Sequence, residues 1–215
     1  MSELEELPPV VTLRDLHESG EALRNRLALA EPAEFRYPIQ PSPRCAVLGS
    51  GFRGGAKTAV VANWQEIDLS SFADTTALAA PVSVLCRLAE RRCELLYPVV
   101  AFTGPCYGTL SESDRECIWR AFGVPVYEQF LGARNELLAE ECDAHDGLHV
   151  RHDRAWFDTR GGELVVTSFA NLAWPVLRLA TGLRGTIERG LCACGRSGFK
   201  LRELTPMPQT LAAIA

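Results

Sequence analysis

Two short stretches of the chain gather side chains that bind metal ions. The first, ECDAHDGLHV (residues 141–150), holds one cysteine and two histidines, and the second, LCACGRSG (residues 191–198), holds a Cys-x-Cys pair followed by glycine. Zinc in proteins prefers four thiolate or imidazole ligands in a tetrahedron, and a shell closed by four such ligands is structural because it leaves no position for water. We therefore predict a structural zinc site formed by Cys142, Cys192, Cys194 and one of the two histidines, His145 or His149.

The remaining cysteines and histidines carry weaker signals. Five cysteines stand singly in apolar surroundings, which is typical of buried free thiols: Cys45, Cys86, Cys93, Cys106 and Cys117. His17 and His152 are interpreted as surface residues. A Cys–His nucleophile pair is a competing interpretation of the cluster, but zinc ligation would use the same side chains. The chain has no G-x-S-x-G or H-E-x-x-H motif, so the sequence gives no support to serine-hydrolase or zinc-protease chemistry.

A glycine-rich loop lies between two apolar runs in CAVLGSGFRGGAKTAVVANW (residues 45–64). A Walker phosphate loop needs G-x-x-x-x-G-K-[ST] between a strand and a helix, so that backbone N–H groups and the helix dipole face the phosphate. Gly51, Lys57 and Thr58 match this spacing, but the second glycine position holds Ala56 and the β-branched run that follows favours a strand. The pattern predicts a glycine-rich turn between two strands.

The elements that must position these motifs alternate between helical and extended patterns. Apolar spacing after Thr12 predicts a helix over 13–30, and residues 70–92 predict a second helix, restarted or kinked at Pro81. A third helix has an N-cap, a capping-box carboxylate and a terminal glycine, at Ser111, Asp114 and Gly123. Strands are predicted over 45–48, 58–64, 95–104, 124–131, 148–159, 162–169 and 174–182. This order predicts an α/β fold with a small sheet appended.

Composition and charge restrict the class of protein. The 215 residues are 47% hydrophobic and 23% charged, as in ordinary globular proteins. The net charge of −5 predicts that the protein does not bind nucleic acid. The N-terminal stretch MSELEELPPVV has no apolar segment typical of a signal peptide, and no apolar run approaches the length of a membrane-spanning helix. We therefore expect a cytoplasmic protein that does not bind membranes, with its cysteines reduced or metal-bound.

Several stretches, read in order, resemble the phenylacetate–coenzyme A ligases of the adenylate-forming (AMP-binding) superfamily. They run from about residue 3 to residue 203: LEELPPVVTLRDLHES, GSGFRGGAKTAVVANWQEIDL, VVAFTGPCYGTLSESDRECIWRAFGVPVYEQFLG, AEECDAHDGLHV, GELVVTSFANLAWPVLRLATG and CACGR. Their shared order carries the resemblance, which implies ATP-dependent acyl-adenylate formation followed by thioester formation. Family members with the same Cys…His…Cys-x-Cys pattern carry a structural zinc. The resemblance therefore favours Cys142, His149, Cys192 and Cys194 as ligands, with His145 as the alternate.

The resemblance also implies a remnant nucleotide site, with the following positions: Ser50, Gly51, Arg53, Gly54, Gly132 and Thr181. The chain departs from the family at each part of it. The family's phosphate loop reads Ser-Gly-Thr-Thr-Gly, whereas Phe52 and Arg53 replace both threonines here. The family's Tyr-Gly-x-x-Glu, whose glutamate handles Mg²⁺, has leucine for tyrosine in this chain, and Glu136 comes one residue late. The ribose-binding aspartate of the family's Thr-Gly-Asp is Leu183, which cannot accept a hydrogen bond.

Compared with the family, the chain is shorter between the glycine-rich loop and VVAFTG. Only ELTPMPQTLAAIA stands where the family has a mobile C-terminal domain with a catalytic lysine. The resemblance thus implies a truncated adenylate-forming N-terminal domain with a central mixed sheet and flanking helices. We expect a shortened α/β core with the remnant phosphate loop over 1–147 and a β-rich, zinc-bearing part over 148–215.

These features predict a degenerate, zinc-stabilised homologue that does not adenylate acids and instead binds a partner protein or a small acyl or aryl ligand. The partner would be a second copy of the chain or a larger enzyme of the same pathway. The alternative is a minimal adenylate-forming acyl- or aryl-CoA ligase, or an acyl-transfer enzyme, with altered active-site residues. In that case ATP and Mg²⁺ are cofactors, and the candidate catalytic residues are Lys57, Arg134 and Glu136.

Overall fold

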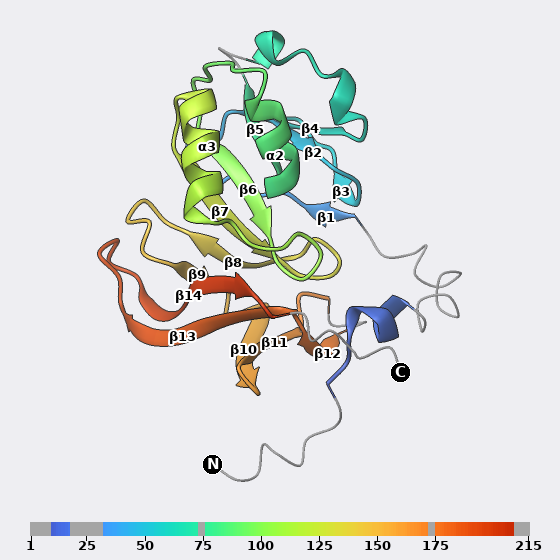
Figure 1. The fold of residues 1–215 in the computed structure, drawn as a ribbon, viewed down its shortest axis with the longest axis vertical. Coiled ribbons are helices and arrows are strands. Elements are labelled where there is room, and N and C mark those ends of the chain that lie inside the picture. Colours follow the sequence, from blue (N-terminus) through green and yellow to red (C-terminus); the bar gives the residue numbers. More distant parts are fainter. Residues whose placement is uncertain (1–9, 18–31, 73–75, 172–174, 209–215) are drawn as a thin grey trace.

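The computed structural model describes residues 10–17, 32–72, 76–171 and 175–208. A nine-stranded sheet runs through the molecule (Figure 1). Its strands, in spatial order, are β13 (Leu183–Leu191), β14 (Ser197–Pro206), β9 (Leu148–Val150), β8 (Leu137–Glu141), β7 (Val126–Leu131), β6 (Val99–Thr103), β5 (Thr76–Pro81), β2 (Arg44–Leu48) and β4 (Thr58–Val61). A three-stranded antiparallel sheet comprises β10 (Ala155–Arg160), β11 (Glu163–Ser168) and β12 (Val176–Ala180). Two short strands, β1 (Ala33–Glu34) and β3 (Phe52–Arg53), pair with each other.

The two halves of the large sheet differ in strand direction because different connections join them. From β4 to β7 all neighbours are parallel, and parallel neighbours need crossover connections. Two of these crossovers are the helices α2 (Val82–Ala89) and α3 (Glu112–Phe122). From β7 through β8, β9 and β14 to β13 the neighbours are antiparallel. The sheet is continuous across residues 147 and 148 because β8 pairs with β9, and the division of the chain at that point stays a prediction.

The third predicted helix is confirmed with both of its end signals. The Ser111 side chain accepts a hydrogen bond from the Asp114 backbone N–H at 3.1 Å, and the Asp114 carboxylate reaches back to the N-cap backbone. Gly123 ends the helix in the left-handed conformation, with φ of 70°. At the first predicted helix, the Thr12 hydroxyl caps a helical turn over residues 13–17, and the rest of that helix lies outside the described residues.

The prediction of one helix over 70–92 was wrong in its first half. Thr76–Pro81 forms the interior strand β5, between β6 and β2, and the helix begins only at Val82. Alanine has high helix propensity, but Ala77 and its three successors are completely buried between layers on both faces of the sheet. Tertiary packing therefore overrides local propensity, and extended Pro81 precedes the helix as its N-cap.

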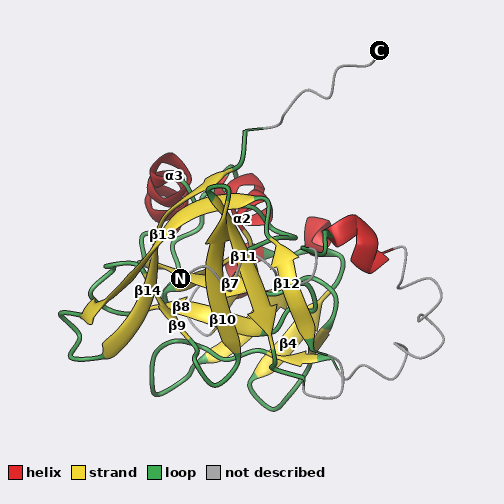
Figure 2. Cartoon of the chain, turned by 90° about the horizontal axis from the view of Figure 1, so that it is seen from below, coloured by secondary structure: helices red, strands yellow, loops and turns green. Residues whose placement is uncertain are grey.

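Three apolar cores fill the layers. One lies between the parallel strands and helices α2 and α3, with Leu78, Leu85 and Phe122 among its members. The opposite face of these strands packs against residues 33–39 and Phe52. The third core lies between the antiparallel strands and the three-stranded sheet, which Figure 2 shows crossing over them. Among the described residues, no helix is long and apolar enough to cross a membrane.

Candidate metal centre

Two turns at neighbouring strands bring four metal-binding side chains together. Cys142 directly follows β8, and His149 lies on β9, which pairs with both β8 and β14. Cys192 and Cys194 lie in the turn between β13 and β14, where the Gly195 N–H donates to the Cys192 carbonyl at 2.9 Å. Gly195 has φ of 84°, which lets the chain reverse directly after the second thiol.

The spacing of the four ligand atoms fits a tetrahedral zinc ion. All four lie within 4.8 Å of one another. The Cys142 and Cys192 Sγ atoms are 3.7 Å apart, and the Cys194 Sγ is 3.5 Å from the His149 Nε2. A tetrahedral zinc with bonds of roughly 2.0–2.3 Å separates two sulfur ligands by about 3.8 Å and a sulfur from a nitrogen by about 3.6 Å. The predicted ligands are therefore close enough together to bind a metal ion such as zinc.

The local electrostatics favour the metal-binding forms of two of these side chains. Hydrogen bonds from the Arg196 side chain and backbone lower the pKa of the Cys194 thiol to about 6. Burial, together with nearby Arg196 and Lys200, lowers the pKa of His149 and so favours the neutral imidazole that binds metals. Burial raises the pKa of Cys142, a shift that the positive charge of a bound metal would oppose. The effect of Arg196 on Cys194 was not predicted from the sequence, where its only signal is the position of this arginine two residues after Cys194.

His145, the alternate ligand, lies outside this cluster. Its Nδ1 is 3.2 Å from the Glu141 carboxylate, and its ring packs at 4.9 Å from the ring of Tyr127. The backbone of His145 has φ of 47°, and its N–H donates to the Cys142 carbonyl at 2.9 Å within the turn between β8 and β9. The structure thus places His149, and not His145, with the three thiols, a choice of ligand that the residue types alone left open.

The glycine-rich loop forms the predicted turn between strands β2 and β4. Phe52 lies in the middle of it and is only 7% exposed, with its ring stacked on Phe102 at 5.1 Å between centroids. Arg53 and Gly54 follow on the exposed side of the loop. The aromatic side chain that replaces the first family threonine is therefore part of the core on the face of the sheet opposite the helices.

A second side chain fills the space beside the glycine-rich loop. The Asn135 amide donates to the Ser50 carbonyl at 3.0 Å, and a Cβ atom on Gly51 would lie 2.5 Å from the same amide nitrogen. The Tyr107 hydroxyl donates a short hydrogen bond to the Asn135 amide oxygen. Asn135 is thus fixed from both ends against the loop.

Glu136, the candidate acid for Mg²⁺, is bound within the turn between β7 and β8. Its carboxylate accepts hydrogen bonds from the Arg134 backbone N–H and from the Ser168 hydroxyl, each at 2.8 Å. A Cβ atom on Gly132 would lie 2.5 Å from this carboxylate, so the absence of a side chain at Gly132 gives Glu136 its place.

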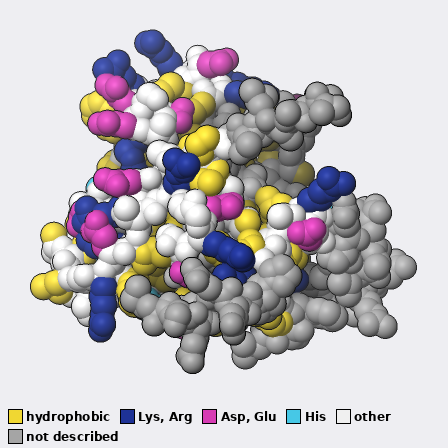
Figure 3. All heavy atoms as spheres, turned by 60° about the horizontal axis from the view of Figure 1, so that its bottom comes forward, with side chains coloured by type: hydrophobic (Ala, Val, Ile, Leu, Met, Phe, Trp, Pro, Cys, Tyr) yellow, Lys and Arg dark blue, Asp and Glu magenta, His cyan; other side chains and the backbone are white. Residues whose placement is uncertain are grey.

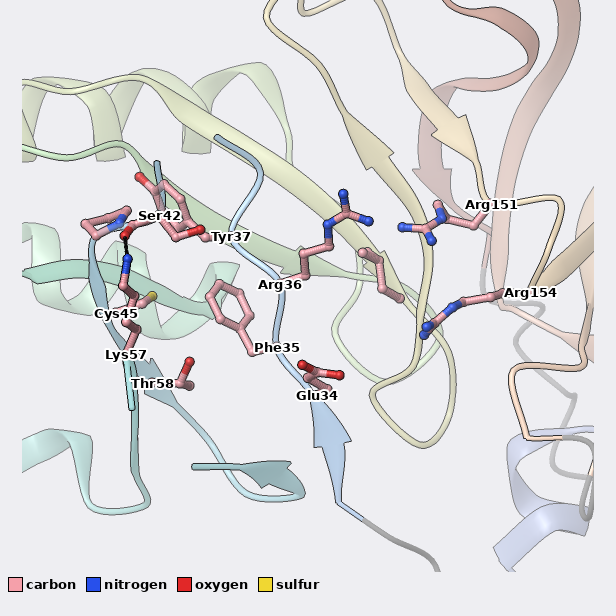
Figure 4. Close-up of a pocket in the computed structure, with 12 residues that line it drawn as sticks. Glu34, Phe35, Arg36, Tyr37, Ser42, Cys45, Lys57, Thr58, Arg151 and Arg154 are labelled. Atoms are coloured by element: carbon pink, nitrogen blue, oxygen red, sulfur yellow. Dashed lines mark hydrogen bonds between the residues drawn. The ribbon is translucent and has the colours of Figure 1, made fainter. Parts of the chain in front are cut away.

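Thr181 and Lys57, the remaining predicted positions, also have partners within the protein. The buried Thr181 hydroxyl donates to the Leu164 carbonyl at 2.8 Å and accepts from the Leu183 N–H. The Lys57 ammonium donates to the Ser42 carbonyl at 2.8 Å and lines a cavity (Figure 4). Thr181 is therefore a buried residue bound to its own backbone surroundings, whereas Lys57 lies at the wall of a cavity.

No protein-family model matches the chain, and no curated protein sequence matches it. Solved structures of 2-hydroxyisobutyryl-CoA ligase match its fold. The ligase in the postadenylation state with R3-HIB-AMP has a TM-score of 0.65 and 18% identity over 93% of this chain. The ligase with 2-HIB-AMP and CoA in the thioesterification state has a TM-score of 0.63 and 17% identity. An open conformation of the same ligase has a TM-score of 0.61 and 16% identity.

These matches cover 58% of the length of the ligase chains. The chain therefore has the fold of part of an adenylate-forming CoA ligase, with a central mixed sheet and flanking helices. This confirms the predicted fold class.

Proposed function

We propose that this protein is a zinc-stabilised relative of the phenylacetate–CoA ligases that does not form acyl adenylates and instead binds a partner protein or a small acyl or aryl ligand. One observation carries the proposal. Three side chains at and beside the glycine-rich loop make contacts within the protein: the Phe52 ring stacks on Phe102, the Asn135 amide donates to the Ser50 carbonyl, and the Glu136 carboxylate accepts two hydrogen bonds.

A triphosphate site needs unpaired donors and space to accept the ligand. Moving Phe52 aside would expose a buried aromatic ring, and moving the Asn135 amide would break its hydrogen bonds with the Ser50 carbonyl and the Tyr107 hydroxyl. Each such loss opposes nucleotide binding, because losing one hydrogen bond costs on the order of 0.5–1.5 kcal/mol. Losing several transition-state contacts together lowers a rate by many orders of magnitude. These considerations favour a binding protein over a ligase.

The metal supports this function by stabilising the antiparallel end of the large sheet. A zinc ion held by the four ligands would tie the turn after β8 to the hairpin of β13 and β14. Binding of a structural zinc contributes to folding free energy because the unfolded chain has no preformed site. The shell of three thiolates and one imidazole leaves no position for a substrate. We therefore assign the zinc a structural role.

Exposed apolar side chains support the partner-binding part of the proposal. Leu191, beside the metal ligands, is 75% exposed, and Trp156 and Trp119 are 57% and 54% exposed. On the face shown in Figure 3, hydrophobic side chains lie among interspersed acidic and basic ones. Mixed charge around apolar groups suits another protein surface better than nucleic acid.

Calorimetric titration of the zinc-loaded protein with ATP–Mg²⁺ and with AMP tests the proposal. We expect no saturable binding at micromolar concentrations. Elemental analysis and a thermal melt of the same sample establish that the protein is loaded and folded. Micromolar binding of either nucleotide would instead favour the minimal ligase, and Lys57→Ala, Arg134→Ala and Glu136→Gln would then locate its active site.

A further inference from the structure

A cavity of about 390 Å³ lies on the face of the large sheet opposite the helices (Figure 4). Four cationic side chains line it, against a single carboxylate, that of Glu34; the cations are Arg36, Lys57, Arg151 and Arg154. None of the residues from Ser50 to Gly54 contributes to its lining. The volume is in the range of small-molecule sites in proteins.

One wall of the cavity is an extended segment with alternating side chains. Phe35 and Tyr37 point into the core, where Phe35 packs edge-on against Phe102 at 6.0 Å and the Tyr37 hydroxyl donates to the Pro98 carbonyl at 2.8 Å. The period of two along an extended chain therefore turns Arg36 to the open side. In the described part of the chain no carboxylate forms an ion pair with Arg36, and its side chain extends toward Arg151 in Figure 4.

The opposite wall is a helical turn between β9 and β10. Backbone N–H groups of Arg154 and Ala155 both donate to the Arg151 carbonyl at 2.8 Å. Residues three apart on such a turn project to the same side, so both guanidinium groups face the cavity. Asp153 holds Arg151 by two contacts of 3.2 and 3.3 Å and lies 3.7 Å from Arg154; Glu140 is 3.7 Å from Arg151. These acids orient the turn and neutralise part of its charge.

Lys57 provides a third position of positive charge. Its ammonium donates to the Ser42 carbonyl at 2.8 Å, which uses one of its three N–H donors and leaves the others available. Positive groups thus lie on three sides of one hollow, and like charges around a shared space are stabilised by an anion between them.

We propose that this cavity binds a small multivalent anion that carries phosphoryl groups. A single carboxylate offers one negative charge, whereas a diphosphate group offers several to the four cationic side chains of the lining. Guanidinium forks match the geometry of phosphoryl oxygens bidentately. The proposal goes beyond the proposed function, because it concerns a cavity that shares only Lys57 with the candidate catalytic residues, and an anion without a nucleoside.

Titration of the zinc-loaded protein with pyrophosphate at low ionic strength tests this assignment. We expect saturable one-to-one binding that weakens as salt is raised. Arg36→Ala and Arg154→Ala each remove one lining guanidinium and should weaken the Kd about tenfold or more. Arg160→Ala, a change at an exposed arginine of β10 outside the cavity, is the matched control and should leave the Kd unchanged. Thermal melts of the three variants establish that they are folded.

Two further titrations distinguish this cavity from the glycine-rich loop, and a phosphoryl site from a site for any multivalent anion. Arg53→Ala should not change pyrophosphate binding, and a loss at Arg53 would move the site to the glycine-rich loop and overturn the assignment. Citrate supplies multivalent carboxylates, and binding of citrate as tightly as pyrophosphate would contradict the phosphoryl preference. Absence of saturable pyrophosphate binding, or an equal loss in the Arg160→Ala variant, would also overturn the proposal. A negative nucleotide titration leaves these outcomes unaffected.

Discussion

The cysteine–histidine cluster and the glycine-rich loop both lie in turns at strand ends, but folding brings ligand atoms together in the cluster and packs other side chains against the loop. At the cluster the four ligand atoms converge within 4.8 Å. At the loop, Phe52 and Asn135 occupy space and hydrogen-bonding groups beside the glycines. A metal site needs a few donor atoms at the correct separation, which two turns provide. A nucleotide site needs unpaired donors and open volume, and under the proposed function the Phe52 and Asn135 side chains take up both.

The largest expected effect comes from removing two ligands of the cluster. Cys192→Ser together with Cys194→Ser should abolish metal binding and lose most of the folded protein, because the open shell no longer stabilises the β13–β14 hairpin. Elemental analysis and the thermal unfolding midpoint measure both effects. Cys117→Ser, at an exposed cysteine of α3, is the matched control and should keep wild-type metal content. A wild-type protein that contains no metal after preparation without chelator would contradict the proposed zinc site.

A smaller but still large effect is expected at the glycine-rich loop. Phe52→Ala leaves a cavity beside the fully buried Phe102 and should lower the free energy of unfolding by about 3–5 kcal/mol. Phe52→Leu keeps most of the volume and should cost less. Urea denaturation measures both changes. A Phe52→Ala variant as stable as wild type would indicate that the loop is not packed as a core element, and would weaken the contrast with the metal cluster.

Between the two regions, Glu128 on β7 gives a pH-dependent test. Its carboxylate accepts a hydrogen bond from the Thr103 hydroxyl at 2.8 Å. Burial, with repulsion from Glu141, raises the pKa of Glu128 to about 7 despite the nearby Arg115. The folded state therefore holds a proton that the unfolded state releases near pH 4.5, so this residue makes stability fall as pH rises from about 4.5 to about 7.

Glu128→Gln should remove this fall. Between pH 5 and pH 8 the variant should therefore gain stability relative to wild type, by on the order of 3 kcal/mol at most. Urea denaturation of wild type and variant at both pH values measures the difference between them. Glu116→Gln, at an exposed position of α3, controls for loss of a negative charge. Parallel pH profiles for wild type and Glu128→Gln would show that Glu128 is ionised throughout this range.

The smallest effect distinguishes the two histidines near Cys142. His145→Ala removes a contact between a partly exposed imidazole and the buried Glu141 carboxylate, which keeps Arg115 and the Glu128 N–H as partners. The change should alter stability by about 1 kcal/mol or less, with metal content unchanged. His149→Ala removes a ligand and should lower metal affinity strongly. Competition with a chromophoric zinc chelator compares the two variants. Equal loss of affinity in both would mean that His145 also ligates the metal.

Much of the local structure follows from nearby residues. Ser111, Asp114 and Gly123 define the ends of α3 because capping needs only groups a few positions apart. By contrast, Thr76–Pro81 was predicted as a helix, since alanine-rich sequence does not reveal that both of its faces are covered. The long strands β13 and β14 were not predicted, because their exposed faces carry charged and small residues without regular alternation.

The sequence by itself determined the ligand types, their Cys-x-Cys spacing and the glycine-rich turn, because these are properties of neighbouring residues. The family resemblance favoured His149 over His145, and the tertiary structure places His149 with the thiols because β8, β9 and β14 pair to bring them together. Only the tertiary structure decided that Asn135 fills the space beside Gly51, and that Arg36 faces Arg151 across a cavity. Contacts between residues as distant along the chain as Ser50 and Asn135 depend on sheet register and packing, which local sequence does not encode.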